Sequence, residues 1–202
     1  VVHADMAKRA LKGVVLGYLA ALDAEHADAM VREQYATADN MTDTLAALQV
    51  ANGYLLPCRA ALLADFEGKW AKDGLVLDNW LRLIGSKPAA DVLGEVKQAM
   101  NHPTFSIRNP NRLRALIGSF AMSNQVQFHA VDGSGYRFLT DLLIELNEVN
   151  PQVASRLITP LIQFKRLDEA RKALIRAELT RLANLEGLAR DLFEKVSKAL
   201  QQ

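Results

Sequence analysis

Four histidines are the residues in this sequence best suited to hold a catalytic metal ion, and their spacing does not support such a site. Zinc hydrolases commonly bind the metal with two histidines one helical turn apart and place a glutamate between them. Here the histidines are His3, His26, His102 and His129, and no HExxH pattern occurs. His129 and Asp132 could touch one ion, but a histidine beside a turn aspartate is more often structural. We therefore predict no metal site in this chain.

Two other residue types could act as nucleophiles, a serine between glycines and a single cysteine. Ser134 lies in Asp132-Gly133-Ser134-Gly135. A nucleophilic serine of the GxSxG type follows a β-strand, but Ser134 lacks this glycine spacing and no strand precedes it. The same glycines lack the GxGxxG or GK[ST] context of a phosphate loop. Cys58 follows Pro57 in an apolar helical segment, where a buried, inert thiol is the default. We expect no catalytic residue in the chain.

Polar side chains on two helices could instead bind a ligand. Gln152, Arg156 and Thr159 recur at helical spacing and should share one face. Arg112 and Arg114 lie in the first turns of another helix. Helix N-termini carry partial positive charge, so arginines near two such ends could form a wall that binds a carboxylate. Arginines that only face solvent are the commoner case, and both interpretations stay open on the residues alone.

The helices that would position these side chains begin at two matching pairs, Asn109-Pro110 and Asn150-Pro151. Asparagine accepts hydrogen bonds from the free amides of a first turn, and proline suits the first helical position. The two starts lie 41 residues apart, and three apolar pairs match at the same offset: Leu116 with Leu157, Ile117 with Ile158, and Phe120 with Leu161. A helical unit that recurs about every 40–47 residues is typical of HEAT and armadillo repeats.

Helical patterns cover most of the remaining chain. Apolar residues recur at i, i+3, i+4 and i+7 from Met6 to Leu22. Further helices are expected over residues 26–38, 45–52, 55–72, 76–84, 89–100, 110–122, 124–130, 136–149, 151 onward, 168–185 and 188–200. No window alternates apolar and polar residues as a half-buried strand would.

Some helix ends can be predicted from individual residues. We expect Thr42-Asp43 to cap the helix at 45–52 and Gly53 to close it. Pro57 should open a new helix, because proline in a helix interior costs about 3 kcal/mol or more. Pro88 fits the first turn of the helix at 89–100. A new helix should begin at Thr159-Pro160, with Thr159 as its cap.

Composition supports one helical domain. The chain has 202 residues, of which 50% are hydrophobic and only 6% aromatic, and its abundant alanine and leucine favour packed helices. Short connections between helices make neighbours antiparallel. The expected fold is therefore all-α, an armadillo/HEAT-like array of antiparallel helix pairs (an α-solenoid), with residues 1–202 as a single domain.

Charge and cysteine content limit the partners and the compartment. The net charge of +1 gives no global attraction to nucleic acid or to an anionic membrane, so we expect neither as a partner. No apolar run approaches the roughly 20 residues that span a bilayer. The single cysteine fits a reducing compartment, and the start of the chain shows no signal-peptide pattern. The expected location is cytoplasmic. The chain begins without methionine just before a strong helix, as a fragment cut at a domain boundary would.

Several long blocks carry a family resemblance. NPNRLRALIGSFA, FHAVDGSGYRFL and NPQVASRLITPLIQFKRLDEAR resemble the C-terminal domain of the bacterial aminopeptidase N (alanyl aminopeptidase) family, zinc metallopeptidases of the gluzincin class. The likeness continues through RALKGVVLGYLAAL and QYATADNMTDTLAAL, and ends in LEGLARDLFEKVSKALQQ. It covers essentially the whole chain.

The resemblance implies a function that spacing does not show. In that family this region is a helical domain that closes over a thermolysin-like catalytic domain, which would be the partner of this chain within one parent protein. Zinc, the HExxH motif and the GAMEN-type substrate motif belong to earlier domains, so the fragment alone should be inactive and need no cofactor. By matching motifs, Arg114, Gln152 and Arg156 resemble residues that face the active-site chamber and meet the downstream end of a peptide substrate.

Two other function classes can be compared with this one. An independent helical-repeat scaffold that binds a partner protein would explain the helices and the absent catalytic motifs equally well. An HExxH domain upstream in the same reading frame would decide for the enzyme. Nucleic-acid binding fits worst, because acidic residues match the basic ones and few aromatic side chains stand among them.

Overall fold

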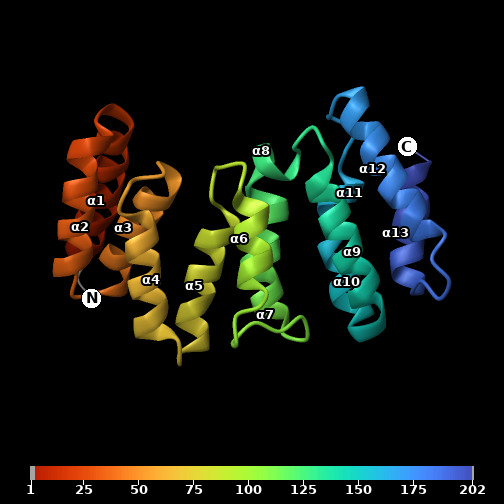
Figure 1. The fold of residues 1–202 in the computed structure, drawn as a ribbon, viewed down its shortest axis with the longest axis horizontal. Coiled ribbons are helices and arrows are strands. Elements are labelled where there is room, and N and C mark those ends of the chain that lie inside the picture. The colour runs from red at the N-terminus through yellow and green to blue at the C-terminus, as the bar shows by residue number, and fades with distance from the viewer. Residues whose placement is uncertain (1–2, 202) are drawn as a thin grey trace.

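The computed structural model is an elongated array of helices, with α1 to α3 at one end and α12 and α13 at the other (Figure 1). It describes residues 3–201; residues 1, 2 and 202, which the predicted domain includes, lie outside the described residues. Helices that pack together are mostly near neighbours along the chain, as in a repeat solenoid. The predicted all-α helical array is confirmed, and residues 3–201 contain no strand.

Thirteen α-helices and one π-helix form the described part of the array. They are α1 (His3–Leu22), α2 (Ala24–Thr37), α3 (Met41–Gly53), α4 (Arg59–Trp70), α5 (Gly74–Gly85), α6 (Val92–Ala99), α7 (Pro110–Leu113), the π-helix η1 (Arg114–Ser123), α8 (Gln125–Phe128), α9 (Ser134–Val149), α10 (Pro151–Leu157), α11 (Thr159–Ile162), α12 (Glu169–Ala183) and α13 (Arg190–Leu200). Across residues 3–201, no helix has both the length and the apolar character needed to cross a bilayer.

The two predicted Asn-Pro helix starts are confirmed. Asn109 accepts hydrogen bonds from the backbone N–H groups of Asn111 (3.0 Å) and Arg112 (3.4 Å) at the start of α7. Asn150 accepts one from Val153 (3.2 Å) at the start of α10. All six residues that match at the 41-residue offset are buried, namely Leu116, Leu157, Ile117, Ile158, Phe120 and Leu161. The match at the 41-residue offset therefore marks equivalent core positions of two helical units.

Two predicted helix starts near the N-terminal end are wrong. Asn40, and not Thr42-Asp43, caps α3, and its side-chain oxygen accepts from the Asp43 backbone N–H at 2.9 Å; the predicted end at Gly53 is confirmed. Pro57 lies two residues before α4 and does not open it. Leu55 adopts a positive φ of 52°, which ends helical geometry there, and residues 54–58 form turns.

Two later helix starts also differ from prediction. Pro88 is outside α6, which begins only at Val92, because its flanking turn is held by the ionic network described below. The short helix α11 does begin at Thr159, but Ile158 occupies the cap position. The Thr159 hydroxyl donates instead to the Arg156 carbonyl at 2.8 Å, so it extends the end of α10 and does not cap α11.

The segment predicted as one helix over 110–122 is an α-turn followed by a π-helix. Only α7 has α-helical geometry, and η1 follows with ten residues. The Asn124 backbone N–H donates to the Ser119 carbonyl five residues earlier at 3.1 Å. A π-helix is a rare wide helix, and its apolar spacing in sequence resembles that of an α-helix. As a result, the backbone of η1 lies in close contact with α5 at Gly85.

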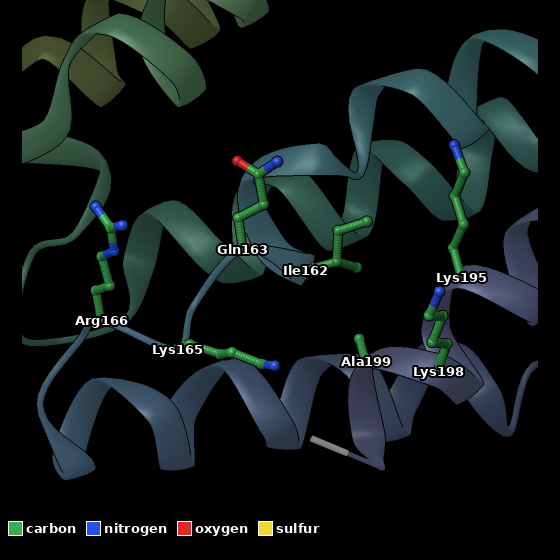
Figure 2. Close-up of a pocket in the computed structure, with 7 residues that line it drawn as sticks. All are labelled: Ile162, Gln163, Lys165, Arg166, Lys195, Lys198 and Ala199. Atoms are coloured by element: carbon green, nitrogen blue, oxygen red, sulfur yellow. The ribbon is translucent and has the colours of Figure 1, made fainter.

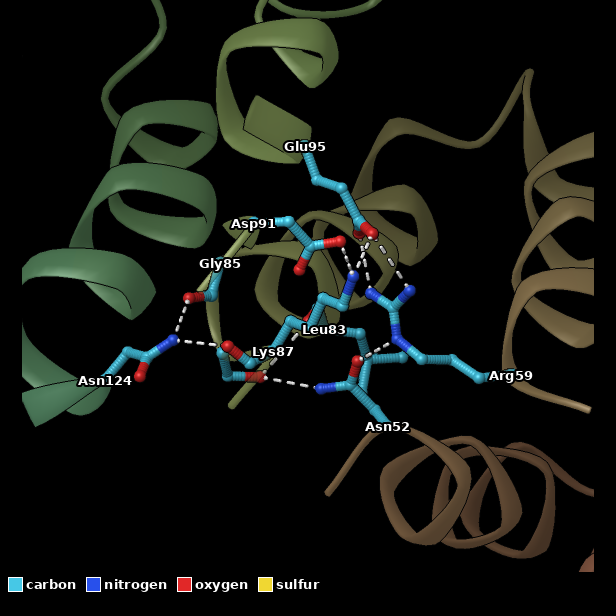
Figure 3. A network of polar contacts seen from close by, with 9 residues as sticks. Asn52, Arg59, Leu83, Gly85, Lys87, Asp91, Glu95 and Asn124 are labelled. Carbon is cyan, nitrogen blue, oxygen red and sulfur yellow. Dashed lines mark hydrogen bonds and ion pairs between the residues drawn. The ribbon is translucent and has the colours of Figure 1, made fainter. Parts of the chain in front are cut away.

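A network of buried and partly exposed polar groups joins the middle of the array (Figure 3). The Arg59 guanidinium donates to both Glu95 carboxylate oxygens (3.2 and 2.7 Å) and to Asn52 (2.7 Å). Lys87 donates to Glu95 and Asp91, each at 2.6 Å. The Asn124 side chain donates to the Lys87 carbonyl at 2.7 Å. These contacts tie α3, α4, α6 and the end of η1 to one turn.

The Glu95 carboxyl makes the stability of this network depend on pH. Burial alone would raise its pKa, but hydrogen bonds and charges from Arg59 and Lys87 outweigh burial and hold the pKa below its ordinary value. A carboxyl with a lowered folded-state pKa contributes stability above its unfolded-state pKa near 4.3, and this stability is lost as pH falls through the folded-state value. Acid should therefore weaken the centre of the array.

We expect Glu95→Gln to lower the free energy of unfolding at pH 7 by about 1.5–3 kcal/mol, because charged hydrogen bonds are lost. The variant should also lose less stability than the wild type when pH falls from about 5 toward 3. Urea unfolding at several pH values measures both effects. Glu169→Gln is the matched control, because its pair with Lys172 is exposed at the surface. Parallel pH profiles for Glu95→Gln and the wild type would contradict the assignment.

Candidate functional site

Arg114 and Arg156 meet at a small cavity between η1 and α10. The cavity has a volume of about 90 Å³, and both arginines line it together with apolar residues such as Leu113 and Val153. Arg114 comes five residues after the Asn109 cap and Arg156 six residues after the Asn150 cap, so the two arginines differ by one position in the 41-residue register. Both nevertheless line the same opening, and none of the described residues that line it is acidic.

Arg156 also lines a wider cleft that contains Gln152. This cleft has a volume of about 440 Å³ and lies between α10 and α13, where Asp191, Glu194 and Lys195 complete its lining with Ser155. Gln152 and Arg156 are both exposed. The amide of Gln152 and the guanidinium of Arg156 offer hydrogen-bond donors in this cleft, while Glu194 is already paired with Arg190 at 2.9 Å.

A third cleft beside α13 is strongly basic (Figure 2). It has a volume of about 680 Å³, and Lys165, Arg166, Lys195 and Lys198 line it with Gln163 and two apolar residues. Figure 2 shows Lys165 extending toward Ala199 on α13, while Arg166 lies at the far side of the opening. Lys195 also donates to the Ser155 carbonyl on α10. None of the described residues that line this cleft is acidic.

Shared residues connect the three openings into one surface. Arg156 lines the first and second, and Lys195 lines the second and third. We call the six basic residues along them the cationic row: Arg114, Arg156, Lys165, Arg166, Lys195 and Lys198. None of the six forms an ion pair with another residue of the described chain. Like charges around the first and third openings, whose described linings hold no acidic side chain, concentrate positive potential there and favour an anionic ligand. Asp191 and Glu194 offset the positive charge at the second opening.

Two residues of the expected carboxylate wall do not lie in these openings. Arg112 is buried, and its guanidinium is paired with Asp78 on α5, so the expectation that it lines the wall is wrong. Its helix position turns it into the core, whereas Arg114 two residues later faces solvent. Thr159 does not line the cleft of Gln152 and Arg156, because α10 ends at Leu157 and the chain turns there.

The residues considered for catalysis have structural roles. The His129 Nδ1 atom lies 2.8 Å from the Tyr136 hydroxyl, and burial followed by the nearby Arg171 charge lowers the pKa of His129, which keeps it neutral at pH 7. Asp132 accepts from the Ser134 backbone N–H at 2.9 Å. Over residues 3–201, no three His, Cys, Asp or Glu side chains are grouped as a metal site requires.

Cys58 is fully buried. Burial, followed by the neighbouring Asp28 carboxylate, raises the pKa of the Cys58 thiol to about 12. A thiol with this pKa is protonated at neutral pH and is a poor nucleophile. The prediction of an inert buried thiol agrees with this environment.

Four members of the cationic row were not predicted, namely Lys165, Arg166, Lys195 and Lys198. Lys195 and Lys198 stand three residues apart, which places them on one face of α13. That spacing could have predicted that the two lysines lie side by side on the helix. The approach of the 163–166 segment to the same face could not be read from the sequence, because it depends on how α11 ends.

Comparison with known proteins shows which family this chain belongs to. A model of ARM repeats, described as a domain of unknown function (DUF3458_C), matches residues 1–201. The chain belongs to this family. The helical repeats that build the cationic row are therefore ARM repeats of the DUF3458_C domain.

Relatives of this DUF3458_C chain include whole aminopeptidases. It is 53% identical over 201 residues to aminopeptidase N of Haemophilus influenzae and 50% identical over 198 residues to aminopeptidase N of Escherichia coli. These matches cover 100% and 98% of this chain but only 23% of each relative, as a C-terminal part. The chain thus spans about a quarter of the length of these relatives.

A solved structure shows the same arrangement of helices. The crystal structure of Legionella pneumophila aminopeptidase A in complex with aspartic acid matches the DUF3458_C domain with a TM-score of 0.88 and 30% sequence identity. The match covers 96% of this chain and 23% of that one. The resemblance noted in the sequence is confirmed by these matches.

Proposed function

We propose that this chain is the C-terminal helical domain of a zinc aminopeptidase that removes N-terminal residues from peptides. In this proposal the domain closes the active-site chamber and gates substrate access, and it catalyses no step itself. Zinc and the reacting groups belong to the preceding part of the full-length protein. The similarity to aminopeptidase N over the whole chain supports the activity class.

The cationic row is the observation that carries the role of the domain. A peptide held by its N-terminus at a catalytic centre presents its downstream end, with a free carboxylate, to the opposite wall. Arg114 and Arg156 share one opening whose described lining contains no acidic side chain, and arginine binds carboxylates through paired N–H groups. Closure over the chamber would exclude water and strengthen these contacts. Gln152, at the adjacent cleft, would donate to peptide carbonyls.

We expect Arg156→Ala in the full-length protein to raise KM for a short peptide with a free C-terminal carboxylate about 10-fold, since a charged hydrogen bond contributes about 1.5–3 kcal/mol. The same peptide with an amidated C-terminus, and a small aminoacyl amide, should change much less. Steady-state kinetics on the three substrates measures this difference. Arg156→Lys should restore part of the loss.

Arg32→Ala provides the matched control, because Arg32 is an exposed arginine at the other end of the array that pairs with Asp28. It should leave all three KM values unchanged. Equal increases for the free and the amidated peptide in Arg156→Ala would argue against a carboxylate contact and against the proposed role of the row.

A further inference from the structure

The third cleft, which we call the basic cleft, is framed by two separate segments of the chain. Lys165 and Arg166 lie in the turn between α11 and α12, and Lys195 and Lys198 lie on α13. Figure 2 shows Arg166 on the side of the opening opposite Lys195 and Lys198. The volume of about 680 Å³ falls in the range of roughly 300–1,000 Å³ that is usual for small-molecule sites. The basic cleft therefore has the size of a ligand site as well as a strong charge.

The turn that carries Lys165 and Arg166 is anchored to α12 and α13. Phe164, just before these two residues, is buried in the core. The guanidinium of Arg176 on α12 lies 5.3 Å from the centre of the Phe164 ring, and it also donates to the Leu200 carbonyl at the end of α13 at 3.2 Å. One side chain thus joins the turn, α12 and α13. The backbone positions of the four cations are therefore set before a ligand arrives, which lowers the entropy lost on binding.

Contacts within the protein explain two of the four cations. Lys198 lies in the last turn of α13, where a positive charge is favourable because a helix C-terminus carries partial negative charge. Lys195 donates to the Ser155 carbonyl on α10. Lys165 and Arg166 are exposed and form no ion pair with another described residue. Four like charges around one opening repel one another, and an anion in the cleft would relieve this repulsion.

The kinds of cation differ between the basic cleft and the opening shared by Arg114 and Arg156. That opening offers two guanidinium groups, whose planar forks match a carboxylate. The basic cleft offers three ammonium groups and one guanidinium group, and lysine binds phosphate groups as a point charge. A terminal carboxylate brings one negative charge, whereas each phosphate group brings about one to two. A chain of two or three phosphate groups therefore matches the four cations better than a peptide terminus does.

We propose that the basic cleft binds the polyphosphate group of a small molecule. Lys165 and Arg166 contact the phosphate oxygens from the turn, and Lys195 and Lys198 contact them from α13, with the Gln163 amide as a further donor. This ligand is distinct from the peptide carboxylate that the proposed function assigns to the arginine pair. The proposal does not rest on that function.

Two kinds of small molecule carry this group, inorganic polyphosphates and nucleoside polyphosphates. Ile162 and Ala199 also line the cleft, and they offer apolar contact to the nucleoside part of the second kind. Inorganic tripolyphosphate therefore tests the charged contacts alone, and ATP tests the charged and apolar contacts together. Equal affinities would assign recognition to the phosphate groups, whereas tighter binding of ATP would add the two apolar residues to the site.

The test is calorimetric titration of the full-length protein with tripolyphosphate and with ATP, at constant ionic strength and without magnesium. Each should bind with one-to-one stoichiometry. Lys165→Ala combined with Lys198→Ala should weaken both affinities at least about 10-fold, because each substitution removes a charged contact. Lys72→Ala combined with Arg108→Ala is the matched control, since both residues are exposed and neither lines the three openings. The control removes the same net charge, and it should change affinity less than about 2-fold because salt screens distant charges.

Four results would overturn the proposal. Failure of both probes to bind the full-length protein would show that the cleft is covered or takes another ligand. Equal losses of affinity in the two double variants would assign binding to general surface charge. Unchanged affinity in the variant of Lys165 and Lys198 would place the polyphosphate elsewhere, such as on the zinc of the proposed parent enzyme. Binding of a triglutamate peptide as tight as that of tripolyphosphate would identify the ligand as an acidic peptide. None of these measurements involves peptide hydrolysis, so they are independent of the proposed chamber role.

Discussion

Replacing Asp78 with alanine is expected to lower the free energy of unfolding by about 3–5 kcal/mol. Asp78 is 4% exposed and Arg112 is 9% exposed, and the two side chains form an ion pair between α5 and α7. The Nε atom of Arg112 is buried without another partner. Asp78→Ala therefore leaves the guanidinium charge of Arg112 in the core without a counter-charge. The resulting loss of stability is larger than the net stability that the ion pair itself contributes.

A double variant separates the unpaired charge from the loss of packing. Asp78→Leu with Arg112→Met removes both charges and keeps apolar volume, so it should lose much less stability than Asp78→Ala alone. Urea unfolding followed by the fluorescence of Trp70 and Trp80 measures all three proteins. A loss below about 1 kcal/mol for Asp78→Ala would mean that water reaches the pair.

The second large effect is expected at Gly85, the last residue of α5. A Cβ atom built there would overlap the Leu116 carbonyl oxygen and lie 3.1 Å from the Phe120 backbone nitrogen. Both atoms belong to the backbone of η1 and cannot turn aside as a side chain could. Gly85→Ala should therefore force α5 and η1 apart and destabilise the protein by about 2–3 kcal/mol, despite the better helix propensity of alanine.

Gly68→Ala is the control for this substitution. Gly68 is an exposed residue in α4, and a Cβ atom there meets nothing within 4 Å. Alanine should stabilise the helix by about 0.5–1 kcal/mol. In thermal unfolding, Gly85→Ala should lower Tm by roughly 5–10 °C, while Gly68→Ala raises it slightly. Similar shifts for the two variants would exclude a close approach of backbones at Gly85.

The fold could be predicted because its main signals are local. Asn109 and Asn150 cap helices through their own side chains, and helical spacing locates most buried positions. The predicted helix starts were wrong where side chains far away in the sequence determine the start. The turn before α6 is held by Asn124, whose side chain donates to the Gly85 and Lys87 carbonyls from another part of the array, and α6 begins only after this turn, at Val92.

The candidate site was predicted in part for the same reason. Arg114 and Arg156 each follow an Asn-Pro helix start that can be recognised in the sequence, and they line one opening although they differ by one position in the 41-residue register. Arg112 was misplaced, because its burial depends on Asp78, which lies 34 positions earlier in the chain. The basic cleft was missed because Lys165 and Lys198 come from separate segments. Their meeting depends on the turn between α11 and α12, which carries no recognisable spacing.

The repeat architecture also allows the spacing between members of the cationic row to change. Members of the cationic row stand on η1, α10 and α13 and in the segment after α11 (Figures 1 and 2), and these elements belong to successive units. In a solenoid, curvature follows from small rotations between neighbouring units. A slight bend near the end formed by α12 and α13 therefore changes the separation of Arg114 from Lys198 without unfolding any helix. In the proposed chamber role, such bending would let the cationic row accommodate peptides of different length.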